Sequence, residues 1–116
     1  MTQTKTEIAT LALRTLGVVP EEQVPTAFQM ATATAGVTRA HAELAYHSIA
    51  YWDVDACPEG VASAFADYVA GDLAPLLATQ ERIPHFQARM IGAMRRMSAV
   101  TARRDNSDAP VKFEDF

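Results

Sequence analysis

The stretch at residues 61–77 constrains the fold more than any other part of the chain, because its large apolar residues recur at helical spacing. They are Val61, Phe65, Tyr68, Val69, Leu73, Leu76 and Leu77. Intervals of three and four residues place such side chains on one face of a helix. No window alternates apolar and polar residues strongly enough to indicate a sheet. The sequence therefore predicts an all-α fold built around this helix, which Pro58 and Glu59 begin and Pro75 kinks or ends.

A first helix is expected at about residues 5–16. Thr4 and Glu7 match a capping box, in which the hydroxyl accepts the amide of the third helical residue and the carboxylate reaches back to the cap amide. Gly17 suits the left-handed conformation that ends many helices. Residues 18–25 hold two prolines and two glutamates, which indicates a loop.

A second helix is expected from Ala27 to about Trp52, after a second capping box at Thr26 and Gln29. Gly36 and the nearby threonines have poor helical propensity, so we expect a bend or break there. Small side chains line one side of this helix, and they would permit another helix to approach closely. They are Ala31, Ala35, Ala42 and Ala45.

A fourth helix is expected to open at Pro84 and to end near Arg104. Its apolar side carries Phe86, Met90, Met94, Met97 and Thr101. Methionines on such a stripe either fill a core or form a surface that accepts a partner. Beyond Arg104 we expect an extended segment, so the chain divides into a helical domain of about four helices at 1–104 and an arm at 105–116.

Charge is distributed in blocks, although the net charge is only −4. Between His41 and Glu81 there are seven acidic residues and no lysine or arginine, and from Arg82 to Arg104 there are six arginines and no acid. Such blocks attract each other within one molecule or between copies. The candidate contact residues of the basic block are Arg89, Arg95, Arg96, Arg103 and Arg104. Their partners are solvent, the carboxylates of another protein, or nucleic acid.

The residue pattern predicts neither a catalytic site nor a bound metal or cofactor. Cys57 is the only cysteine, and no two of the three histidines have the spacing of a helical zinc site. Gly-rich phosphate loops and nucleophile elbows are missing from the sequence. We therefore expect a protein that is not an enzyme. No stretch has the length and apolar character of a membrane span or signal peptide, so we also expect a cytoplasmic location.

The order of these pieces resembles a family of viral proteins. The resemblance rests on the first helix ending "LALRTLGVV", the proline-led cap in "VPTAFQMATA", the segment "DACPEGVASAFADYVAGDLAPLLA" and the Arg-rich last helix. Together these are similar to the head-to-tail connector proteins of tailed bacteriophages, also called head-completion or portal adaptor proteins. The similarity extends over about residues 5–104.

This resemblance implies a structural role in the virion, at the neck between head and tail. Small helical subunits of the family form a ring, commonly of twelve, that docks under the portal protein and extends the DNA channel. Tail proteins or a second adaptor then attach to that ring, and DNA passes through without specific binding. An extended C-terminal arm, here Asn106 to Phe116, holds the portal or neighbouring subunits. The docking residues of this arm would be Pro110, Val111, Lys112, Phe113 and Phe116.

A DNA-binding or DNA-packaging accessory protein is the alternative interpretation. In that case the Arg-rich fourth helix would contact phosphates, and Arg95 and Arg96 would be required for binding. The acidic net charge argues against general affinity for nucleic acid, since such affinity comes from neutralising phosphates. The two functions differ in their salt dependence and in their partner.

Overall fold

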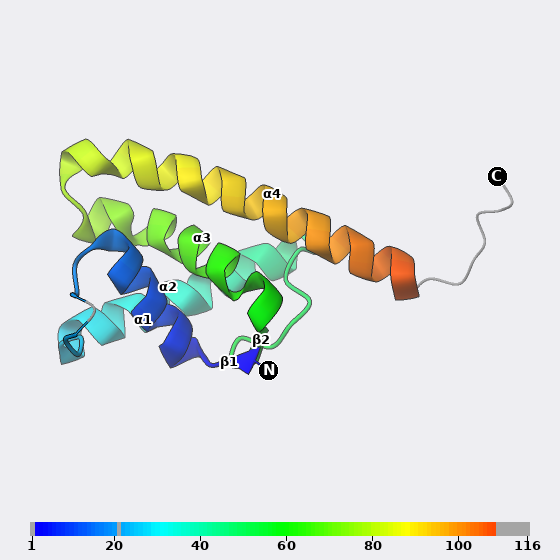
Figure 1. The fold of residues 1–116 in the computed structure, drawn as a ribbon, viewed down its shortest axis with the longest axis horizontal. Coiled ribbons are helices and arrows are strands. Elements are labelled where there is room, and N and C mark those ends of the chain that lie inside the picture. The colour runs from blue at the N-terminus through cyan, green and yellow to red at the C-terminus, as the bar shows by residue number, and fades with distance from the viewer. Residues whose placement is uncertain (1, 21, 109–116) are drawn as a thin grey trace, which may run out of the picture.

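The computed structural model describes residues 2–20 and 22–108 of the chain. Four α-helices make up most of this part (Figure 1): α1 (Lys5–Leu16), α2 (Ala27–Tyr46), α3 (Glu59–Leu77) and α4 (Ile83–Asp108). A 3-10 turn at Gln80–Arg82 precedes α4. Two short strands, β1 (Thr2–Gln3) and β2 (Cys57–Pro58), pair antiparallel with Thr2 opposite Pro58. The predicted all-α class is confirmed, and this small pairing was not foreseen.

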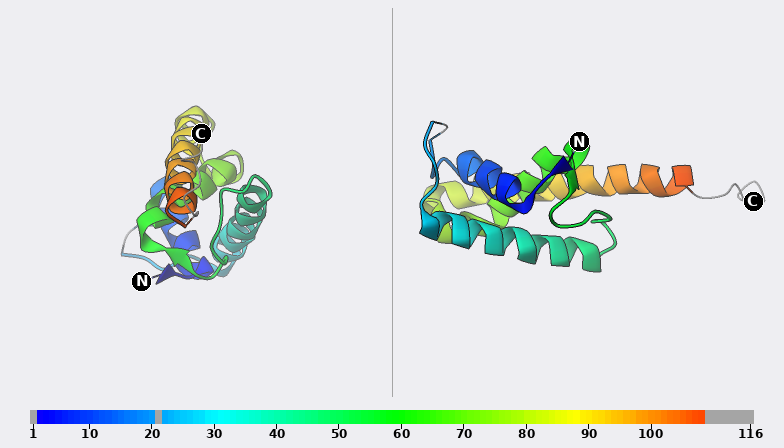
Figure 2. Two further views of the ribbon diagram at one scale, coloured as in Figure 1. Left: turned by 90° about the vertical axis from the view of Figure 1, so that its right-hand side faces the viewer. Right: turned by 90° about the horizontal axis from the view of Figure 1, so that it is seen from below.

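Helix α3 lies at the centre of the bundle and packs against each of the other helices. Figures 1 and 2 show α4 along one side of α3, while α1 and α2 lie on the other side. Buried side chains therefore surround α3, and twelve of its residues are buried. The largest wholly buried side chains in the core are Phe65, Phe86, Ile8, Leu13, Leu16, Leu44, Leu73 and Met97. Burial on several sides explains why the apolar pattern of α3 is the densest in the chain.

Both predicted capping boxes are present. Thr4 Oγ1 accepts a hydrogen bond from the Glu7 amide at 3.2 Å, and Glu7 Oε1 accepts one from the Thr4 amide at 2.8 Å. Thr26 and Gln29 make the same pair of bonds at the start of α2. Gly17 has a φ of 79°, as expected of the left-handed residue that ends α1. Local chemistry thus defines where these helices begin and end.

The predicted end of α2 at Trp52 was wrong, because the helix ends at Tyr46. Ser48 has a positive φ of 60°, and the amides of Ile49 and Ala50 both donate to the Leu44 carbonyl. The chain thereby turns back, and it carries Trp52 into the core against Phe65, at 5.5 Å between ring centroids. Ile49 and Trp52 are at least partly buried, as their apolar character indicated, but they reach the core from a loop.

Gly36 does not interrupt α2, which runs continuously past it. The glycine is buried against α3, where a Cβ would lie 2.8 Å from Leu73 Cδ2. The absent side chain therefore permits close packing rather than a bend. Pro75 lies within the last turn of α3, which continues for two more residues to Leu77.

Helix α4 ends later than expected, because it runs to Asp108 instead of Arg104. Residues 105–108 therefore belong to the helix and not to the extended segment that was expected to begin there. The remainder of the proposed arm, with Pro110, Val111, Lys112, Phe113 and Phe116, lies outside the described residues. On the apolar side of α4, Phe86, Met97 and Thr101 are buried, while Met90 and Met94 are half-buried. This methionine stripe faces α3, which supports its interpretation as core.

Candidate interaction surfaces

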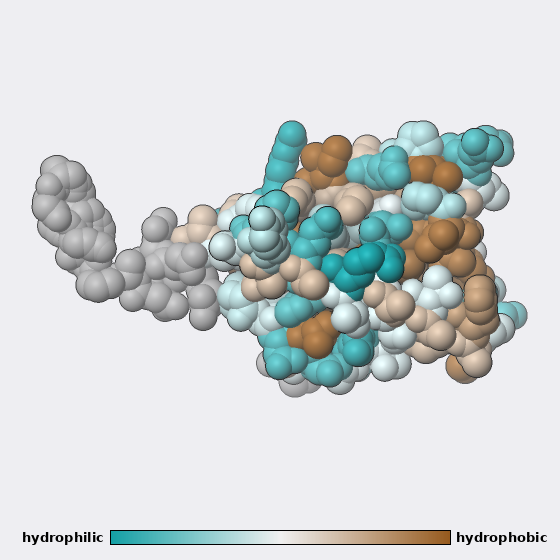
Figure 3. Space-filling model, turned by 180° about the vertical axis from the view of Figure 1, so that it is seen from behind, coloured by the Kyte–Doolittle hydropathy of each residue, from teal (hydrophilic) through white to brown (hydrophobic). Residues whose placement is uncertain are grey.

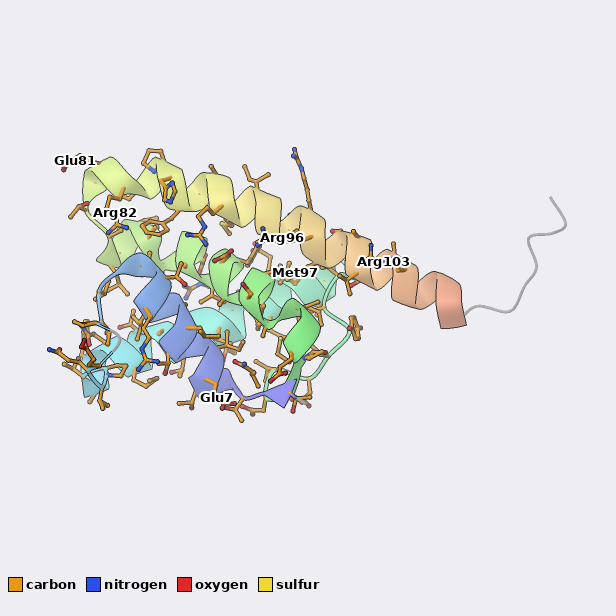
Figure 4. The ribbon with its side chains drawn as sticks, viewed as in Figure 1. Glu7, Glu81, Arg82, Arg96, Met97 and Arg103 are labelled. Carbon is orange, nitrogen blue, oxygen red and sulfur yellow. The ribbon has the colours of Figure 1, made fainter. Side chains whose placement is uncertain are left out.

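Two of the candidate arginines bind one buried carboxylate. Asp67 of α3 is only 7% exposed, although it is ionisable. Arg89 Nη2 donates to its Oδ1, and Arg96 Nη2 donates to its Oδ2, each at 3.0 Å. Figure 4 shows Arg96 extending from α4 toward α3. Both carboxylate oxygens are thereby paired, which a buried charge requires.

This pairing joins the acidic and basic blocks of the sequence within one molecule. The side chains of Arg89 and Arg96 remain 44% and 58% exposed, so each keeps donors that face solvent. They hold α3 and α4 together, and they are only partly available to a partner. Sequence reasoning missed Asp67, yet a signal existed. Arg89 and Arg96 are two helical turns apart, and Asp67 is one of only two acids, with Asp72, within the apolar run at residues 61–77.

The other candidate arginines are placed differently. Arg95 points away from the core, is exposed, and forms no ion pair with any side chain that the structure describes. Arg103 is also exposed. Arg104 lies within the last turns of α4, and the conformation of its side chain lies outside the described part of the chain. The structure therefore brings Arg89 and Arg96 together and leaves Arg95 apart from them.

A groove of about 360 Å³ lies between the first turns of α3 and the second half of α4. Its walls are mostly small or apolar, and two guanidinium groups border it. The lining residues are Gly60, Val61, Ser63, Ala64, Arg96, Ala99, Val100 and Arg103. An apolar floor beside two cations suits a segment that carries both apolar and acidic side chains.

Polar contacts fasten α2 to α3 on the other side of the bundle. Arg39 Nη2 lies 2.6 Å from Asp72 Oδ2, and the Tyr68 hydroxyl donates to Glu43 Oε1. Burial and the neighbouring Glu43 raise the pKa of Tyr68, so this phenol stays protonated. The only two Arg, Lys, Asp or Glu side chains of α2 are thus turned toward α3.

His41 and Cys57 lie in structural positions. The described residues contain no group of three or more His, Cys, Asp and Glu side chains placed to hold a metal ion. His41 Nε2 lies 2.6 Å from the Trp52 carbonyl oxygen and so helps to hold the loop after α2. Burial raises the pKa of the Cys57 thiol to about 12, which keeps this cysteine protonated and a poor nucleophile.

Apolar surface gathers at one end of the bundle. In Figure 3, which views the molecule from behind, it covers the end where α2 starts and α3 finishes. Val24, Phe28 and Leu76 are the large exposed apolar residues of these segments.

No helix of residues 2–20 and 22–108 combines the length and hydropathy that crossing a bilayer would need. Comparisons of this chain with models of protein families, with curated proteins and with solved structures find no match.

Proposed function

We propose that this protein is a structural subunit of a phage head-to-tail connector ring. It would dock under the portal, extend the DNA channel and form the platform for tail proteins or a second adaptor. The virion neck would be its final location, after synthesis in the host cytoplasm. The observation that carries the proposal is the overhang of α4, which continues past the start of α3, so that the C-terminal end of the helix lies away from the bundle (Figures 1 and 2).

Helix lengths explain the overhang. With a rise of about 1.5 Å per residue, the 26 residues of α4 span about 39 Å, and the 19 residues of α3 span about 28 Å. The two helices run antiparallel from a short connection, so the last turns of α4 extend past the core. A single copy has no evident use for a helix continued in this way. A subunit that must reach a partner does.

The composition of residues 109–116 suits such a partner. Val111, Phe113 and Phe116 are apolar, and Glu114 and Asp115 are acidic. Ordering such a segment costs about 1–2 kcal/mol per residue in backbone entropy. Burying two phenylalanines and one valine offsets about 5–8 kcal/mol of that cost, and main-chain hydrogen bonds to the edge of a partner's sheet contribute further stabilisation. The portal, or the apolar and basic groove between α3 and α4 of a neighbouring subunit, supplies the matching chemistry.

The DNA-binding alternative has less support from the contacts. Arg89 and Arg96 are already engaged by Asp67, so the outward-facing charge of α4 is smaller than its sequence suggests. The net charge of −4 adds general repulsion from phosphates. A channel wall through which DNA must slide is consistent with weak affinity.

The test is a truncation at Asp108, which removes only residues beyond α4. We expect the truncated chain to keep its helical circular dichroism and its unfolding midpoint but to lose co-purification with the portal protein of the same phage. The full chain is the control, and Phe113→Ala, a milder change within the same segment, should weaken the binding. Undiminished portal binding after truncation would show that residues 109–116 do not hold the portal protein.

Duplex DNA provides the opposing measurement. The connector proposal expects no appreciable change in fluorescence anisotropy of labelled DNA at moderate salt. Binding that weakens steeply with salt, and that disappears in Arg95→Ala, would favour the accessory DNA-binding protein instead.

A further inference from the structure

The outward face of α2 carries no charged side chain of its own, and the one cation beside it is Lys5 of α1, whose Nζ lies 3.5 Å from Thr38 Oγ1. The exposed residues of this face include Phe28, Ala31, Ala35, Thr38, Ala42 and Tyr46. Phe28 is 74% exposed and Tyr46 is 84% exposed. A surface helix ordinarily turns charged and polar side chains to solvent. Here Arg39 and Glu43, at the edge of the face, are bound to α3, so the face between the two aromatics consists of small side chains.

The outward face of α4 is also largely uncharged. Pro84, Ala88, Ile91 and Arg95 follow one another along it, and all four are exposed. Ile91 is 57% exposed at the middle of the helix. Arg95 is the one charged member of this row, and it has no ion-pair partner among the described side chains. The apolar stripe of α4 that packs on α3 lies on its other side.

The two faces share one spacing. The α2 positions 31, 35, 38 and 42 are separated by four, three and four residues, and so are the α4 positions 84, 88, 91 and 95. This alternation is the spacing of the seam between packed helices. When the two rows are laid parallel, each residue meets its counterpart. Ile91 then lies beside Thr38, among the small alanines of α2, and Arg95 lies beside Ala42 and next to Glu43.

We infer that the α2 face of one copy packs in parallel on the α4 face of a second copy of this chain. Shape supports the pairing, because the bulky Ile91 meets a row of small residues that permits close approach. Charge supports it as well, because Arg95 and Glu43 are of opposite sign: Arg95 has no ion pair among the described side chains, and Glu43, although its Oε1 accepts from the Tyr68 hydroxyl, is exposed and in no ion pair. The partner is therefore another subunit.

The arrangement of the helices favours repeated addition. Helices α2 and α4 run in the same direction and lie on different sides of α3 (Figures 1 and 2). A contact between two different faces leaves one free face of each kind at every step, so it produces a closed ring or an open filament. Rotation about an axis parallel to the helices keeps α2 and the neighbour's α4 parallel, as the shared spacing requires. This inference rests on the proposed function only in taking the product to be a ring.

Disulfide trapping in the full chain tests the contact. A double variant, Thr38→Cys with Ile91→Cys, places the two thiols opposite each other in the proposed register. We expect mild oxidation at high protein concentration to give a ladder of dimers, trimers and larger oligomers on a non-reducing gel. The single variants, which retain the buried native Cys57, should stay monomeric. Dimers from Thr38→Cys alone would show two-fold pairing of α2 and would overturn the inference, as would a double variant that remains monomeric.

Charge exchange adds a second test. In the trapping variant, Arg95→Glu should reduce the yield of trapped oligomer several-fold, and adding Glu43→Arg should restore it. Arg14→Glu, a reversal at an exposed position of α1, is the matched control and should change nothing. Equal effects of Arg95→Glu and Arg14→Glu would show that Arg95 does not pair with Glu43 of the neighbouring copy. A ladder from a chain that fails to bind portal would support the contact between α2 and α4 but reject the connector function. Portal binding without a ladder would support the connector function but reject this contact.

Discussion

Gly71 of α3 lies so close to Met90 of α4 that a Cβ added to the glycine would be 2.5 Å from Met90 Cβ. The two backbones approach here without an intervening side chain, and the crossing of α3 and α4 depends on that approach. The neighbouring atom belongs to the root of the methionine side chain. A change of rotamer cannot move it away, so any added methyl group must displace a helix.

Replacing this glycine should therefore destabilise the fold even though alanine is the better helix former. We expect Gly71→Ala to lower the free energy of unfolding by about 1–3 kcal/mol, as overpacking does. Urea unfolding followed by circular dichroism measures the change. Gly92→Ala is the matched control, because a Cβ at Gly92 meets nothing within 4 Å. That variant should be more stable by about 0.5–1 kcal/mol, and a gain at both sites would disprove the close crossing.

The Asp67 cluster makes a second prediction. Asp67→Asn keeps the shape of the side chain but removes the charge that both arginines share, and we expect it to cost about 1–3 kcal/mol of stability. Because Arg89 and Arg96 are roughly half-exposed, solvent screens much of the attraction, and the lower part of that range applies.

Double-mutant cycles separate the contributions within this cluster. Asp67→Asn combined with Arg89→Gln should show a coupling energy of about 0.5–1.5 kcal/mol, and likewise with Arg96→Gln. Arg95→Gln, which removes an arginine of the same helix without a described ion pair, should alter the stability of the monomer by less than about 0.5 kcal/mol. Additive effects within the cycles would show that the ion pairs contribute nothing to stability.

Stability should fall above pH 9 because of Cys57. Burial raises the pKa of its thiol from 9.0 to about 12. Between these values the unfolded chain releases a proton that the folded chain retains, so a rising pH stabilises the unfolded state and lowers the free energy of unfolding. The expected slope is up to about 1.4 kcal/mol per pH unit.

The measurement is the free energy of unfolding at several pH values from 8 to 10. Tyr68 contributes in the same direction at higher pH, because burial and Glu43 raise its pKa too, so the lower window isolates the cysteine. Cys57→Ala should flatten the curve in this window, whatever its effect on overall stability. An unchanged slope in that variant would assign the pH dependence to other groups.

Sequence reasoning succeeded where the determinants are local. The two capping boxes and Gly17 depend on residues within one helical turn, and the structure contains them as expected. It failed at the end of α2, because the burial of Trp52 depends on Phe65, which is distant in sequence. An apolar residue at helical spacing looks the same whether it arrives on a helix or on a loop that folds back.

For the candidate surfaces, too, local features could be predicted from the sequence and long-range contacts could not. The alanines of α2 indicated a face for close helix packing, and the structure leaves Ala31, Ala35, Ala42 and Ala45 exposed. Which arginines of α4 were already engaged could not be judged from composition, because that depends on the register between α3 and α4. Arg89 and Arg96 both bind Asp67, and this pairing was not foreseen because Asp67 lies in a mostly apolar stretch of α3.

Thr101 carries the last prediction, since it belongs to the apolar stripe of α4 but makes a specific polar contact. Its hydroxyl donates to the Ile49 carbonyl at 2.7 Å, and the residue is buried. Thr101→Val keeps the volume and leaves that carbonyl unpaired, so we expect a loss of about 1–3 kcal/mol in the free energy of unfolding. Amide hydrogen exchange in the loop at 47–56 should also become faster, because the contact ties this loop to α4.

Thr101→Ser is the appropriate control for that change. It keeps the hydroxyl and removes one methyl group, so the exchange rates of the loop should stay near those of the parent chain while stability falls by about 1 kcal/mol from the lost packing. The two variants therefore separate hydrogen bonding from packing at one position. If serine loosened the loop as much as valine, the methyl group and not the hydroxyl would be the contact that holds residues 47–56 against α4.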